Sequence, residues 1–153
     1  MTRDVLLSIR GLQTDLDQEG VTANEPIEII TPANYFCKNG KHYILYEEVA
    51  EGVPGVTKNK VKITDENSIE ILKSGNVNAH MIFQKDKDSM TYYNTPFGQM
   101  LVGIHTSDIQ LKVSEERLFM QVNYGLDINH APYADCEIKM DVQSKDVKEF
   151  PFA

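Results

Sequence analysis

The sequence contains no tryptophan and only two cysteines, Cys37 and Cys136, which lie far apart in the chain. Two separated cysteines do not make a disulfide framework, and neither one has neighbours that would activate a thiolate. The four histidines also lack the close spacing of metal ligands, although strand pairing could bring His80 and His105 together. We therefore expect reduced, inert thiols in a cytoplasmic protein, with no metal site.

Long apolar runs and clustered basic residues are missing as well. The first apolar run, residues 5–9, ends at Arg10 and is too short for a signal sequence or a membrane span. The chain has 15 Lys and Arg residues against 23 Asp and Glu residues, which gives a net charge of −8. Nucleic-acid and anionic membrane surfaces both select clustered positive charge. The composition therefore predicts neither a nucleic-acid partner nor a membrane partner.

Motifs for catalysis or cofactor binding are also missing, because the sequence has no glycine-rich phosphate loop and no nucleophile elbow. The acidic spacing from Asp15 to Gly20 imitates the start of an EF-hand, but Pro26 stands where the bidentate glutamate belongs. We expect a solvated acidic loop over residues 15–26 instead of a calcium site. The sequence predicts no catalytic residue, no cofactor and no metal ligand.

Apolar and polar residues alternate with a period of two through most of the chain, and no long window has a helical period. Strands are expected over residues 4–14, 27–36, 42–48, 57–64, 68–73, 78–84, 89–94, 99–106, 109–113, 118–124 and 136–142. The Asn39-Gly40 pair between two of them predicts a type I′ hairpin turn. Short strands separated by turns are typical of a closed antiparallel barrel or a sandwich. A chain of 153 residues is expected to form a single domain.

The densest run of aromatic, β-branched, Gly and Pro residues spans residues 92–106. Pro96 cannot serve a central ladder, so Pro96 followed by Gly98 predicts a turn or a bulge. The residues expected on the core face of the strand that follows are Met100, Val102 and Ile104. Gly103 marks a corner at which a barrel sheet can bend.

Several short motifs surround this run. They are Ser74-Gly75, His80-Met81-Ile82-Phe83, Tyr93-Asn94-Thr95-Pro96-Phe97-Gly98, Thr106 and Tyr124-Gly125-Leu126. Together they resemble the YwiB-like family, which consists of uncharacterised bacterial proteins with a domain of unknown function. The resemblance implies a calycin-like, up-and-down antiparallel barrel of about 8–10 strands in a cytoplasmic protein, with residues 1–153 as one domain. It implies no activity and no site residues, and the Gly-x-Trp signature of lipocalins is absent.

A barrel of this size is either filled by its own side chains or able to hold one small ligand. The residues expected to contact such a ligand are Tyr46, Met81, Phe83, Tyr93, Phe97, Met100, Val102, Met120 and Tyr124. Three of them are methionines, which suit irregular apolar sites but also fill gaps in a packed core. The leading hypothesis is a non-enzymatic binding protein for a small, largely apolar ligand.

Two other functions stay open. An aromatic rim of Tyr92, Tyr93, Phe97 and Tyr124, or an unpaired strand edge, would make the protein an interaction module or a homodimer. The same aromatic residues could equally plug one end of the barrel. The third alternative is an enzyme, in which the run Tyr46-Glu47-Glu48 supplies an acid or base inside the barrel.

Overall fold

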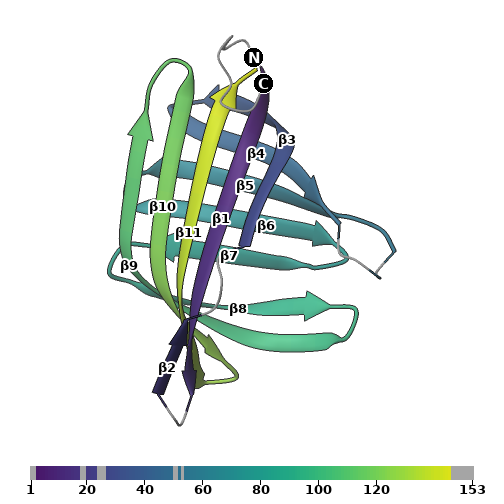
Figure 1. Ribbon diagram of the computed structural model, residues 1–153, viewed down its shortest axis with the longest axis vertical. Coiled ribbons are helices and arrows are strands. Elements are labelled where there is room, and N and C mark those ends of the chain that lie inside the picture. Colours follow the sequence, from purple (N-terminus) through teal and green to yellow (C-terminus); the bar gives the residue numbers. More distant parts are fainter. Residues whose placement is uncertain (1–2, 18–19, 24–26, 50–51, 53, 146–153) are drawn as a thin grey trace.

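The computed structural model describes residues 3–17, 20–23, 27–49, 52 and 54–145, and its regular secondary structure consists of eleven strands (Figure 1). The strands are β1 (Arg3–Asp17), β2 (Gly20–Ala23), β3 (Ile27–Lys38), β4 (Lys41–Glu48), β5 (Thr57–Asp65), β6 (Ser68–Gly75), β7 (Ala79–Gln84), β8 (Asp88–Thr95), β9 (Gly98–Val113), β10 (Arg117–Ile128) and β11 (Ala131–Ser144). Within the described residues, no helix is long and apolar enough to cross a membrane.

All strands belong to one antiparallel sheet, which closes into a nearly complete barrel. The order is β7-β6-β5-β4-β3-β1-β11-β10-β9-β8, with β2 paired to β1 outside this path. The first and last long strands, β1 and β11, pair from Val5 opposite Ser144 to Asp15 opposite Ala134. The remaining seam lies between β7 and β8, where Asn78 and Asn94 exchange two backbone hydrogen bonds of 2.9 Å. The predicted antiparallel barrel is confirmed.

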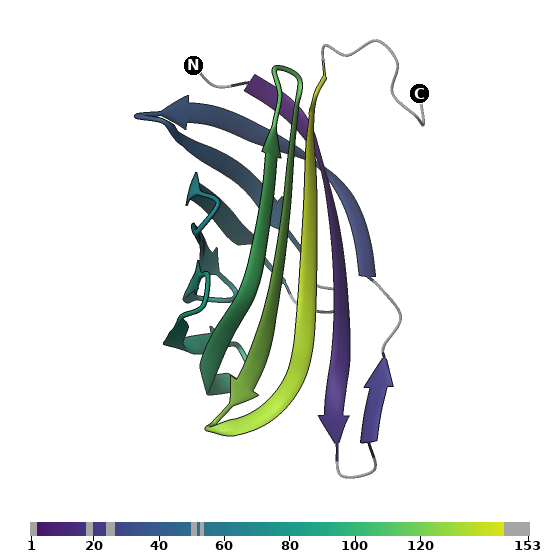
Figure 2. The same cartoon turned by 90° about the vertical axis from the view of Figure 1, so that its left-hand side faces the viewer.

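Two walls that cross each other enclose the core. Strands β9, β10, β11 and β1 stand side by side as one curved wall, while β4 to β7 run across behind them (Figures 1 and 2). The side chains with no solvent exposure come from both walls and include Leu7, Ile44, Ile63, Ile69, Phe83, Ile104 and Met120. This burial follows the predicted alternation, because every second residue of a strand points to the same face.

The turns of the barrel match most of the sequence signals. Asn39 and Gly40 have φ values of 54° and 75°, as a type I′ turn requires. Pro96 lies outside the ladder at the tip of the β8–β9 hairpin, which closes with Thr95 opposite Gly98. Gly103 packs close to another strand, since a β-carbon there would stand 3.2 Å from the β-carbon of Asp127.

Two predicted breaks are wrong. Residues 15–17 continue β1, and Gly20–Ala23 returns as β2, so the expected loop over residues 15–26 contains a hairpin. Residues 18–19 and 24–26 lie outside the described part of the chain. The predicted break at Ser107-Asp108 is a bulge within one strand, because Asn123 faces Asp108 while Tyr124 faces Thr106. The polar pair Ser107-Asp108 predicted an interruption, but β9 continues there and contains one extra residue.

Candidate functional site at the fork between β3 and β4

The barrel wall opens laterally where β3 and β4 diverge. Their ladder runs from Lys38 opposite Lys41 to Asn34 opposite Leu45, and residues 27–33 of β3 then pair with β1 alone. Figure 1 shows β3 turning down beside β1 while β4 continues across the barrel. A groove of about 690 Å³ lies at this fork, and its lining includes Thr31, Pro32, Ala33, Leu45 and Tyr46.

The β3 side of the fork is apolar and open to solvent. Ile27 and Ile29 lie opposite Gly11 and Ile9, so they project from the inner face of the wall. Their exposed fractions are nevertheless 68% and 45%. A cavity of about 340 Å³ adjoins Ile27, and its lining also includes Gly11, Tyr124, Cys136 and Ile138. Apolar side chains on the inside of the barrel are therefore accessible from outside.

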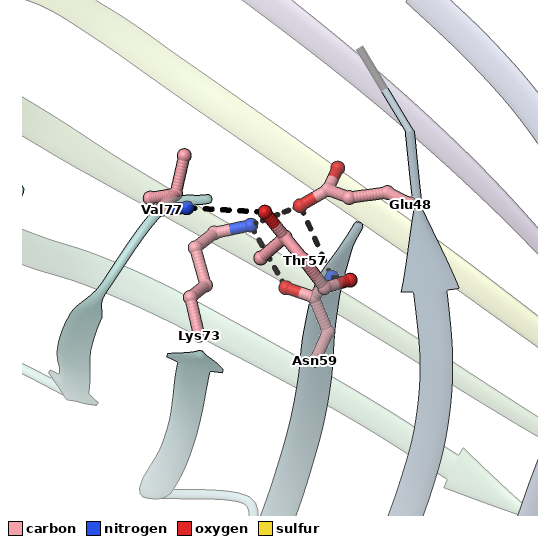
Figure 3. Close-up of polar contacts among 5 residues, drawn as sticks. All are labelled: Glu48, Thr57, Asn59, Lys73 and Val77. Carbon is pink, nitrogen blue, oxygen red and sulfur yellow. Dashed lines mark hydrogen bonds and ion pairs between the residues drawn. The ribbon is translucent and has the colours of Figure 1, made fainter. Parts of the chain in front are cut away.

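The β4 side of the fork is polar. Glu48, Asn59 and Lys73 come from the adjacent strands β4, β5 and β6 and point toward one another (Figure 3). The Lys73 Nζ atom donates to Glu48 Oε1 at 2.8 Å and to Asn59 Oδ1 at 2.9 Å. Asn59 Nδ2 in turn donates to Glu48 Oε1 at 3.0 Å, and only 1% of Asn59 is exposed. The burial of Asn59 is tolerated because its amide nitrogen donates a hydrogen bond and its amide oxygen accepts one.

The Glu48 carboxylate is ionised at neutral pH. Burial acts to raise its pKa, but the hydrogen bond and charge of Lys73 and the hydrogen bond from Asn59 outweigh burial, so the pKa is lowered. A carboxylate of low pKa is a weak general base. Both hydrogen bonds end on Oε1, and Oε2 accepts none from the described residues. The arrangement therefore favours binding over proton transfer.

Two tyrosine hydroxyls lie near this carboxylate. Burial first, and then the charge of Glu48, raise the pKa of both Tyr46 and Tyr93. The hydroxyls therefore remain protonated hydrogen-bond donors. Neither hydroxyl makes a hydrogen bond to another described residue. Burial also raises the pKa of Tyr124, whose ring packs edge-on against Phe83 at a centroid distance of 5.0 Å.

The structure distributes the residues predicted from the sequence over three places. Tyr46, Tyr93 and Tyr124 face the inside near the fork, and Glu48 joins them while Glu47 faces outward. Five others point into the core, namely Met81, Phe83, Met100, Val102 and Met120. Phe97 is 88% exposed at the hairpin tip.

The four aromatic residues of the expected rim do not come together. Tyr92 and Tyr93 are neighbours in β8 and therefore project from opposite faces, with Tyr92 57% exposed. Phe97 lies at the hairpin tip, whereas Tyr124 packs inside against Phe83.

Sequence reasoning missed four residues of the fork: Ile27, Ile29, Asn59 and Lys73. Asn59 and Lys73 occupy inward positions of their strands, opposite Tyr46 and opposite Asn59 respectively. Their meeting depends on the register of three strands, which no local pattern encodes. The alternation of Ile27 and Ile29 with Glu28 was visible, but their exposure depends on the divergence of β3 from β4.

The histidines lie outside this site. His105 is held on the outer face between Asp88 at 2.8 Å and Asp127 at 2.6 Å, and these hydrogen bonds raise its pKa. His80 instead pairs with Glu70 at 2.8 Å, so the two histidines do not meet. Within the described residues, no three His, Cys, Asp or Glu side chains are placed to hold a metal ion.

Comparisons with known proteins agree with the fold. Residues 8–140 match DUF1934, described as a domain of unknown function. The uncharacterised β-barrel protein YwiB of Bacillus subtilis (strain 168) is 28% identical over 104 residues, which cover 68% of this chain and 71% of YwiB. The crystal structure of the ywiB protein from Bacillus subtilis superposes with a TM-score of 0.74, covers 92% of both chains and is 20% identical.

Proposed function

The chain belongs to the DUF1934 family of unknown function, and we propose that it is a non-enzymatic protein that binds a small, largely apolar ligand at the fork between β3 and β4. One observation carries the proposal. Ile27 and Ile29 project from the inner face of the barrel and yet are 68% and 45% exposed. The ligand would cover these side chains and enter the barrel between β3 and β4.

The energetic reason is the hydrophobic effect. Full burial of an isoleucine side chain stabilises by about 1.5–3 kcal/mol, and the exposure of Ile27 and Ile29 leaves much of this unrealised. A ligand that removed both side chains from water would gain part of it. The adjoining cavity of about 340 Å³ falls in the range of small-molecule sites, which is about 300–1,000 Å³.

The packing of the core supports a ligand site at the fork rather than along the barrel axis. Phe83 and Met120 are 0% exposed, and Val102 is 4% exposed. Side chains without accessible surface leave no room for a ligand beside them. The tyrosines at the inner end of the fork, in contrast, border the cavity or lie near the Glu48 carboxylate.

The test is a fluorescence titration with N-phenylnaphthylamine, a neutral apolar probe, on the wild type and two variants. Ile29→Asp places a charge on the inner face, so we expect at least a tenfold loss of affinity, because an uncompensated carboxylate resists burial. Ile30→Asp is the matched control, since Ile30 is the next residue, is 50% exposed and faces outward. Equal affinities in both variants, or no saturable binding to the wild type, would refute the proposal.

A second function has an observation of its own, the unpaired edge of β3. Along residues 27–33, β3 pairs with β1 on one side and has no described partner strand on the other. A free strand edge is a template for another strand, and it would make the protein a homodimer or a receptor for an extended peptide.

Sedimentation equilibrium over the micromolar range tests this alternative. Edge pairing depends on backbone hydrogen bonds, so a dimer should survive Ile29→Asp and dissociate when a strand-mimicking peptide is added. A wild type that remains monomeric and takes up no such peptide would remove the alternative.

A further inference from the structure

We propose that the ligand of the fork carries a neutral hydroxyl head group, held by Tyr46, Tyr93 and the Oε2 atom of Glu48. This inference rests on the proposed function, because it concerns the polar end of the same opening. The ligand would be an apolar alcohol, and its apolar body would lie against Ile27 and Ile29.

The position of the polar groups supports this assignment. Tyr46 and Glu48 are two residues apart in β4 and project to the same inner face, opposite Asn59 and Thr57. Tyr93 of β8 faces the same interior, because it lies opposite Met100 and packs with it against the core. Burial and then the Glu48 charge raise the pKa of its phenol, as they do that of Tyr46. The hydroxyls make no hydrogen bond to the carboxylate or to any other described residue. Three polar groups thus converge without satisfying one another.

The apolar end of the opening lies next to these groups. Burial raises the pKa of Tyr124, which also lies close enough to Tyr93 for an ionised Tyr93 to raise that pKa further. Tyr124 lines the cavity of about 340 Å³ together with Ile27. A single molecule can therefore extend from the isoleucines to the tyrosine hydroxyls. Sites of this kind place a few polar groups at one end of an apolar pocket, where they orient the ligand.

Charge decides which head group fits. Lys73 already compensates the Glu48 carboxylate at an N–O distance of 2.8 Å, so the site does not require a second cation. An anionic head group would lie beside the Glu48 charge and be repelled. A hydroxyl group both donates to Oε2 and accepts from a tyrosine hydroxyl. The donors and the acceptor of the site match this neutral group.

Three ligands with the same number of carbon atoms test the inference: decanol, decanoate and decylamine. Each would be added as a competitor of N-phenylnaphthylamine in a titration at neutral pH. We expect decanol to bind at least fivefold more tightly than either charged compound. Tyr46→Phe and Tyr93→Phe should each weaken decanol about fivefold relative to the probe, the effect of one hydrogen bond. Tyr92→Phe is the matched control, because Tyr92 is the outward-facing neighbour of Tyr93.

The outcomes separate this inference from the proposed function. Tighter binding of decanoate or decylamine overturns the hydroxyl assignment but leaves an apolar site at the fork. Probe binding that decanol does not displace, or decanol binding that neither Phe substitution changes, also overturns it. A wild type that binds neither the probe nor any alkyl compound refutes the proposed function itself.

Discussion

Lys73→Met is the substitution that most directly probes the polar side of the fork. It removes the ammonium group that donates to Glu48 and Asn59, and it leaves a carboxylate without a counter-charge. Breaking a fully buried ion pair in this way costs about 3–5 kcal/mol. The side chain of Glu48 is 39% exposed and that of Lys73 is 14% exposed, so solvent screens part of the loss. We therefore expect a destabilisation of about 1–2 kcal/mol, or about 2–8 °C in Tm.

Urea denaturation at several pH values supplies the assay. The folded-state pKa of Glu48 lies below its ordinary value of 4.5, so its contribution to stability is present above that value and is lost as the pH falls through the lower folded pKa. Lys73→Met removes the cause of this lowering. The stability difference between wild type and variant should thus be largest at neutral pH and shrink as the solution becomes acidic.

Two further variants complete the experiment. In a double-mutant cycle, Glu48→Gln and Lys73→Met should show a coupling of at least about 0.5 kcal/mol, because the pair is in contact. Lys62→Met is the control, since Lys62 reaches Glu70 only at 3.9 Å on the outer face and should cost less than about 0.5 kcal/mol. A Lys73→Met protein as stable as the control, or a coupling of zero, would show that the Lys73–Glu48 pair does not stabilise the fold.

Two other predictions concern stability away from the fork. Asp127 and Asp88 raise the pKa of His105, so its contribution is fully present below the ordinary value of 6.5 and is lost as the pH rises through the higher folded pKa. The Tm advantage of wild type over His105→Gln should therefore shrink as the pH rises above 6.5, and an advantage that grows with pH would contradict this. Thr106 is 3% exposed and its Oγ1 has no hydrogen-bond partner among the described residues. Thr106→Val should therefore stabilise the protein by about 1 kcal/mol in urea denaturation, and a loss of stability would contradict this.

Local patterns predict the barrel well because each strand buries one face. The alternation through Val102 and Ile104 identifies side chains that are 4% and 0% exposed. Strand ends and interruptions are harder to predict, since they depend on which strand lies alongside. The polar Ser107-Asp108 pair resembles a break, yet the ladder of β10 holds it within β9. The polar segment before Ile27 likewise contains a short strand because β1 continues far enough to pair with it.

The site is less accessible to sequence reasoning than the fold. Tyr46, Tyr93 and Tyr124 stand out as aromatic residues at inward positions. One carboxylate of the Glu47-Glu48 pair must also face inward, because neighbouring residues of a strand point to opposite faces. Which polar groups would meet Glu48 depends on the register of β4, β5 and β6. The opening itself arises because β3 leaves β4 after a short ladder, and this divergence has no signature in composition or periodicity.

Methyl NMR of isoleucine side chains tests the entry of an apolar ligand at the fork most directly. The protein would be labelled at the isoleucine δ1 methyl groups and titrated with N-phenylnaphthylamine. We expect saturable shifts for Ile27 and Ile29, with Ile30 and the fully buried Ile63 unchanged. Shifts at Ile30 without shifts at Ile29, or no saturable shift at either inward-facing residue, would contradict it.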